Sequence, residues 1–251
     1  MKETLKLYYR NLAYRKRFNE IARQNKLSID FAPNAGSFAT FQSIFMGREY
    51  ADFFPFYKTA TVLDVGAHYG YFSLFASLNL SEQSRIVSIE PSFSNFIVLQ
   101  ENVRRSRLAN IETLNVGVSG TTGAIKLFKS TSVNNSIFQE VAHSASEAYE
   151  TIESMRLEDV FVENNVHTVD FLKMDCEGAE YEIFYNTPRK VLDMITTISM
   201  EFHDLKRADA TANDLSLFFK KSGFDVVKLQ YSGTGLGLNY GKLVVTKIYL
   251  G

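Results

Sequence analysis

The sequence predicts an α/β fold for residues 58–251, in which a mostly parallel sheet is covered by helices on both faces. Two observations support this prediction. From residue 61 onward, short runs rich in β-forming residues alternate with stretches whose apolar residues recur at helical spacing. The chain then ends in two β-rich runs joined by a glycine-rich turn, which predicts an antiparallel pair.

Five short, apolar runs are expected to form the parallel strands. They are residues 61–65 (TVLDV), 85–90 (RIVSIE), 111–119 (IETLNVGVS), 168–175 (TVDFLKMD) and 196–202 (TTISMEF). Helices are expected between them, at 69–80, 92–108, 178–195 and 212–223. An additional strand at 123–128 (GAIKLF) and a polar loop around 130–147 interrupt the alternation. The antiparallel pair comprises residues 224–231 and 242–250.

Residues 1–57 are expected to form a helical, aromatic-rich extension. Apolar residues recur at three- and four-residue steps near the N-terminus, and residues 31–57 contain seven phenylalanines. One interpretation is an extra helical layer packed on the core. The other is that the segment covers the active site, contacts substrate or forms a homodimer interface, because large apolar patches mark interaction sites.

Composition limits the classes of partner and compartment. The chain has 251 residues, of which 45% are hydrophobic, which fits one globular domain. A net charge of −1 gives no indication of nucleic acid or an anionic membrane as partner. No apolar run approaches the roughly 20 residues of a membrane span. A single cysteine cannot form an internal disulfide, so a cytoplasmic protein is expected.

The loop after the first strand predicts the chemistry of the ligand. A dinucleotide-binding loop has the pattern G-x-G-x-x-G, whereas this loop carries Asp64 where the first glycine would stand, followed by Gly66 and Gly70. A carboxylate would repel a pyrophosphate by about a kcal/mol or more at close range. A positively charged ligand is therefore expected. Asp64 could also simply cap the following helix.

Glu90 adds a second indication. It ends the second strand, 26 residues after Asp64, where an acid can accept hydrogen bonds from both ribose hydroxyls. Because Pro91 follows it, Glu90 could instead mark the start of a helix. Together the two acids favour a cationic nucleoside without phosphates, namely S-adenosylmethionine, with Asp64 holding its ammonium end directly or through water.

Further acids end the fourth and fifth predicted strands. Asp175 is followed by Glu177 and Gly178, and Glu201 lies two residues before His203. Ligands of open α/β sheets bind in the crevice outside the carboxyl ends of the strands. Asp175 and Glu201 are therefore expected to line one crevice together with Asp64 and Glu90.

Five segments taken in order resemble the FkbM family of S-adenosylmethionine-dependent methyltransferases. They are VLDVGAHYGYFSLFAS, IVSIEPSFSNFIVLQENV, NVGVSG, VDFLKMDCEGAEYEIF and ISMEFH, within residues 60–205. The resemblance implies the seven-stranded class I methyltransferase (Rossmann-like) fold, with the last strand inserted antiparallel. It also implies methylation of a hydroxyl on a sugar or secondary metabolite.

The resemblance assigns site residues by position. Asp64, Gly66 and Gly70 match the cofactor loop, which also contains Ala67 and His68 as expected cofactor contacts. Glu90 matches the ribose acid and Asp175 the acid near the transferred methyl group. Gly117 and Val118 match the turn beside the adenine.

An alcohol acceptor needs a base as its oxygen is methylated. Of the four histidines, His203 is favoured for this role because it follows Glu201 at the crevice edge, with Asp175 and Glu201 as neighbouring catalytic carboxylates. The same three residues could hold a divalent metal, but nothing in their spacing requires one. Two alternatives stay open at this point: a nicotinamide-dependent oxidoreductase, and a non-catalytic methyltransferase-like subunit.

Overall fold

The computed structural model describes residues 15–29, 35–128, 136, 148–205, 207–235 and 238–247. Phe31 and the polar loop expected around residues 130–147, apart from Ser136, lie outside the described residues. No helix among the described residues is long and apolar enough to cross a membrane.

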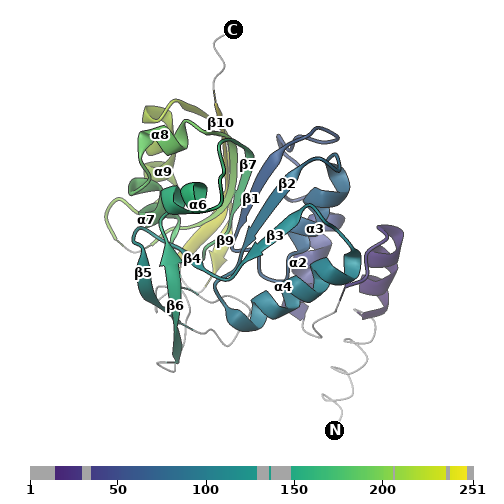
Figure 1. Cartoon of the computed structure of the whole chain (residues 1–251). Coiled ribbons are helices and arrows are strands. Elements are labelled where there is room, and N and C mark those ends of the chain that lie inside the picture. Colours follow the sequence, from purple (N-terminus) through teal and green to yellow (C-terminus); the bar gives the residue numbers. More distant parts are fainter. Residues whose placement is uncertain are drawn as a thin grey trace.

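The described chain is built on a seven-stranded sheet of order β3-β2-β1-β7-β8-β10-β9 (Figure 1). Its strands are β1 (Thr61–Val65), β2 (Arg85–Ile89), β3 (Ile111–Leu114), β7 (Val169–Met174), β8 (Ile195–His203), β9 (Phe224–Gly235) and β10 (Leu238–Lys247). Neighbours from β3 to β8 are parallel, whereas β10 runs antiparallel to both β8 and β9. The predicted fold class is confirmed, including the inserted antiparallel last strand.

Helices cover both faces of this sheet because successive strand residues point to opposite sides. The helices are α2 (Ala35–Phe45), α3 (Tyr71–Asn79), α4 (Phe93–Ser106), α6 (Leu157–Glu163), α7 (Glu180–Tyr185), α8 (Arg189–Leu192) and α9 (Ala212–Lys221). Val62 packs in a buried cluster with α2 and α3, and Leu63 in another with α6 to α9. Figure 1 shows these two groups of helices on opposite sides of the strands.

A small second sheet lies below the main one in Figure 1, in the order β4-β6-β5. Its strands are β4 (Gly117–Val118), β5 (Gly123–Phe128) and β6 (Tyr149–Met155). The single strand expected at 111–119 is therefore two strands in two sheets. β5 was predicted, but β6 and α6 were not. Polar residues make up most of β6 (YETIESM), and of its residues only Ser154 is buried.

The N-terminal segment packs as a layer of the core. Residues 15–24 are helical, and the Phe18 and Phe41 rings lie 4.3 Å apart between centroids. Both belong to the same buried cluster as Tyr50, Val62 of β1 and Phe171 of β7. This packing agrees with the interpretation as a helical layer. The boundary at residue 57 and a homodimer contact stay predictions.

Candidate active site

The loop after β1 depends on two glycines. Gly66 and Gly70 have φ angles of +76° and +79°, in the left-handed region that favours glycine. A Cβ atom on Gly66 would lie 1.9 Å from the carbonyl oxygen of Asp175, and one on Gly70 would lie 2.3 Å from Leu99 Cδ1. The loop thus turns tightly against the end of β7, which brings Asp175 beside the expected cofactor loop.

Asp64 is fully buried beneath this loop and has partners of its own. Its Oδ1 forms an ion pair with Lys173 Nζ at 3.2 Å, and its Oδ2 accepts a hydrogen bond from Ser73 at 2.6 Å. Lys173 Nζ also donates to the carbonyl oxygen of Gly66 at 2.7 Å. Asp64 thus has no accessible surface and acts on the loop through Lys173. The expected contact of Asp64 with an ammonium group, directly or through water, stays a prediction.

Glu90 lies directly after β2 and faces the same loop. Its Oε2 accepts the backbone N–H of His68 at 2.7 Å, and its Oε1 accepts the backbone N–H of Ser92 at 3.0 Å. Burial raises the pKa of Glu90 to about 7, although these hydrogen bonds oppose the shift. His68 is also largely enclosed, so burial and the charge of Lys173 lower its pKa to about 4 and keep its ring neutral.

Two adjoining hollows meet at the ends of the strands. A narrow cleft of about 120 Å³ is lined by Gly66, His68, Glu90, Gly117, Val118 and Asp175, among others. A wider cavity of about 490 Å³ is lined by Ala67, Lys173, Glu201, Tyr240 and residues of the N-terminal segment. Gly66, His68 and Asp175 line both, so they stand where the two hollows join.

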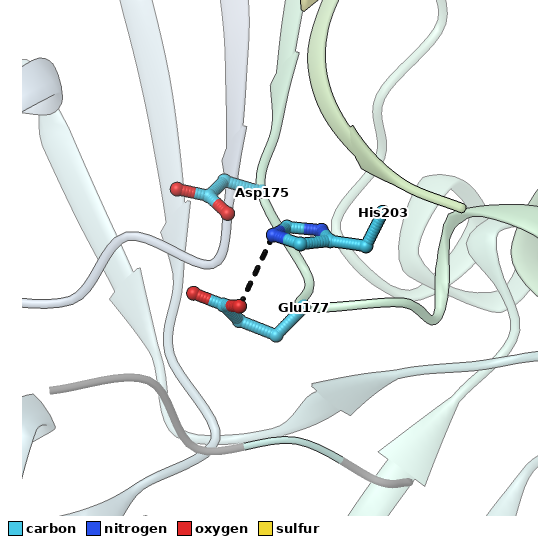
Figure 2. A group of neighbouring side chains, drawn as sticks. All are labelled: Asp175, Glu177 and His203. Atoms are coloured by element: carbon cyan, nitrogen blue, oxygen red, sulfur yellow. Dashed lines mark ion pairs between the residues drawn. The ribbon is translucent and has the colours of Figure 1, made fainter. Parts of the chain in front are cut away.

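Carboxylates surround His203, which is buried and neighbours Asp175. Figure 2 shows Asp175 above and Glu177 below the Nε2 end of the imidazole, whose Nε2 lies 3.2 Å from Glu177 Oε2. Nε2 is also 3.5 Å from Glu201 Oε1, and Nδ1 is 3.5 Å from Glu180 Oε1. Asp175 Oδ1 is buried and has no hydrogen-bond partner among the described residues.

The charges of this cluster shift its pKa values in a consistent way. Burial alone would lower the pKa of His203, but Glu180, Glu201 and Glu177 hold it well above the ordinary range. Burial raises the pKa of Asp175 and of Glu177, and repulsion between the carboxylates adds to both shifts. These shifts favour the protonated form of His203, whereas a general base needs the neutral ring. The role of His203 as the base stays a prediction.

Comparison with known proteins identifies the family. Residues 64–226, well over half of the chain, match the family model described as the methyltransferase FkbM domain. The chain belongs to the FkbM methyltransferase family. Membership in this family favours methyl transfer over the nicotinamide-dependent alternative.

Named relatives of this FkbM chain are distant. It is 25% identical over 203 residues to Methyltransferase 1 of Beauveria bassiana, and the aligned region covers 74% of this chain and 80% of that protein. It is 24% identical over 196 residues to Methyltransferase sdnD of Sordaria araneosa, covering 66% and 74%. A putative rRNA-methylase from Clostridium thermocellum shares the fold, with a TM-score of 0.51 and 12% identity over 82% of this chain and 97% of that one.

Three side chains of the FkbM site could hold a divalent cation. Asp175, Glu177 and His203 each offer a ligand atom, and these atoms all lie within 4.8 Å of one another. Glu177 thus stands where the sequence suggested Glu201. A metal would need an unprotonated Nε2, whereas the surrounding carboxylates favour the imidazolium, which already supplies a positive charge at this point.

Four residues of the site were not singled out from the sequence. Glu177 and Glu180 stand in the quoted segment DCEGAE, and Lys173 is a lone cation within the apolar strand before it. Each could have been found from its place beside a strand end. Tyr50 lies in the N-terminal segment, outside the recognised motifs, and nothing in its sequence neighbourhood links it to the cavity that it lines.

Proposed function

We propose that this FkbM methyltransferase transfers a methyl group from S-adenosylmethionine to a hydroxyl of a small acceptor, such as a sugar or secondary metabolite. One observation carries the proposal: Asp175 lines both the cleft and the wider cavity. A donor in the cleft and an acceptor in the cavity would then meet at a carboxylate, in the close alignment that displacement chemistry requires.

The cleft suits a cationic nucleoside. Gly66, Ala67 and His68 would hold it along the loop, Glu90 would accept from its ribose, and Gly117 and Val118 would flank its base. S-adenosylmethionine, when bound, supplies an activated methyl group on a sulfonium. The buried carboxylate of Asp175, whose Oδ1 has no hydrogen-bond partner in the described part of the chain, offers compensating negative charge at the junction.

Asp175 is the proposed proton acceptor. A carboxylate whose pKa is raised by burial is a stronger base than an exposed one, and it lies at the junction where the acceptor oxygen must sit. His203, as an imidazolium between Glu177 and Glu201, would keep Asp175 ionised by its positive charge. Glu201 would orient the acceptor from the cavity wall.

The proposal also covers partners and place of action. With a net charge of −1, the protein is proposed to act on small molecules rather than nucleic acid, in the cytoplasm. No divalent metal is needed for the proposed proton transfer.

Calorimetry with S-adenosylhomocysteine tests cofactor binding. Mass spectrometry of candidate acceptors after incubation with S-adenosylmethionine tests transfer, both in EDTA and with added Mg²⁺. Binding followed by a methyl-sized mass increase in EDTA is the expected result. Absence of binding would favour the non-catalytic alternative, and activity only with Mg²⁺ would restore a metal at Asp175, Glu177 and His203.

A further inference from the structure

A tyrosine of the N-terminal segment brings a hydroxyl to the wider cavity. Tyr50 is 4% exposed as a residue and lines this cavity. Among the described residues its hydroxyl has no hydrogen-bond partner, and it does not belong to the fully enclosed atoms, since it faces the cavity. The hydroxyl is therefore available to a molecule that fills the cavity.

The Tyr50 ring is held firmly in place. It packs edge-on against Phe72 at 5.1 Å between centroids, and Lys242 Nζ lies 3.9 Å from its centroid. The same ammonium group donates to the carbonyl oxygen of Glu49, and Lys228 forms a 2.6 Å ion pair with Asp52. The C-terminal β9–β10 pair thus fixes the segment on both sides of Tyr50, so the phenol is positioned before any ligand binds.

The charge of the cavity indicates which acceptors fit. Asp175 and Glu201 contribute carboxylates to its wall, while the positive charge of Lys173 is matched by Asp64. Burial and the nearby carboxylates raise the pKa of Tyr50 well above its ordinary value, so the phenol remains a hydrogen-bond donor. The phenol of Tyr50 can donate a hydrogen bond to one hydroxyl of a ligand, and the carboxylates can accept a hydrogen bond from the next. The same carboxylates would repel a phosphate or carboxylate group on the ligand.

We propose that Tyr50 is a specificity-determining residue that donates a hydrogen bond to an uncharged acceptor carrying adjacent hydroxyls, one bonded to Tyr50 and the next presented to Asp175. This inference rests on the proposed function. It adds the residue that selects the acceptor and the exclusion of anionic acceptors.

Tyr50→Phe is the informative variant, because it keeps the ring against Phe72 and Lys242 and removes only the hydroxyl. Tyr185→Phe is the matched control, since the Tyr185 hydroxyl donates to the carbonyl oxygen of Asp209, outside the cavity. Full-length protein loaded with S-adenosylhomocysteine is titrated calorimetrically with methyl α-D-glucopyranoside, methyl α-L-rhamnopyranoside and myo-inositol. D-Glucuronate and D-glucose 6-phosphate serve as anionic counterparts.

At least one neutral polyol is expected to bind about tenfold more tightly than the anions. Tyr50→Phe should lower the affinity for that polyol about tenfold and leave the affinity for S-adenosylhomocysteine unchanged. Tyr185→Phe should change neither affinity. Each of three results would overturn the inference. Tyr50→Phe could bind the polyol as tightly as wild type, the anions could bind as tightly as the neutral polyols, or no polyol could bind. Failure of wild type to bind S-adenosylhomocysteine would instead reject the proposed function, and the inference with it.

Discussion

Asp64 and Asp175 look alike in the sequence, since each is an acid near the end of a buried strand, but their surroundings differ. Asp64 is the fourth residue of β1 and pairs in register with Lys173 of β7, so both side chains lie under the loop. Asp175 follows the last residue of β7 and reaches the junction of cleft and cavity. Asp64 is level with Lys173, so a displacement of two residues along the strand direction separates a supporting acid from one that can meet a ligand.

The largest effect is expected at the acid that faces the ligands. Asp175→Asn keeps the shape of the side chain but removes its capacity to accept a proton. Losing a general base typically lowers rates about 10²–10⁴-fold, so methyl transfer at saturating substrate should fall by that factor. Affinity for S-adenosylhomocysteine, measured by calorimetry, should change much less. A rate within fivefold of wild type would mean that alignment alone drives the reaction.

The ion pair of Asp64, the supporting acid, should matter mainly for the stability of the fold and less for the methyl-transfer step. Lys173→Met leaves Asp64 buried without its cation, which typically costs about 3–5 kcal/mol of folding free energy. Urea unfolding measures this loss. Glu20→Gln is the control, because the Arg17–Glu20 pair is about half exposed and should contribute less than about 1 kcal/mol. Equal destabilisation by both variants would contradict the distinction between the two acids.

The positions of the main-sheet strands along the chain and of most site residues were predictable because strand periodicity and strand ends are local signals. The arrangement of the strands in a seven-stranded sheet was expected only from the family resemblance. Glu90, Gly117, Val118 and Asp175 do line the cleft as expected. The pairing of Asp64 with Lys173 was not predictable, because it depends on the register between β1 and β7, 109 positions apart along the chain.

The surroundings of His203 could not be predicted from the sequence either. Glu201 is two residues away and was weighed, but Glu177 and Glu180 come from the segment after another strand. Burial alone would lower the pKa of His203, but the combined charge of these carboxylates raises it. The size of this electrostatic effect depends on distances that only the folded chain supplies. The same holds for Tyr50, which the aromatic packing of the N-terminal segment brings to the cavity.

His203→Gln tests whether the imidazolium supports Asp175. Its positive charge lowers the pKa of Asp175, so its removal should raise that pKa and move the acidic limb of the rate profile to higher pH. Transfer at pH 7 should fall about tenfold, and part of this loss should be recovered at higher pH. A variant whose acidic limb disappears would instead show that His203 itself is the base.

The smallest effect concerns Glu90, at the cofactor end of the cleft. Ribose hydroxyls would donate to its ionised form, whereas protonation occupies an oxygen that must accept. Since its pKa in the free protein is raised to about 7, affinity for S-adenosylhomocysteine should be constant above pH 8 and fall about tenfold towards pH 6. Calorimetry from pH 6 to pH 8 measures this pH dependence. Glu90→Gln should bind S-adenosylhomocysteine more weakly, and its affinity should not change with pH.

Glu101→Gln is the control for this pH dependence. Ion pairs lower the pKa of Glu101 to about 2, so it does not titrate between pH 6 and pH 8. Wild-type affinity that stays constant from pH 6 to pH 8 would remove Glu90 from the ribose site and leave it a support for the loop, like Asp64.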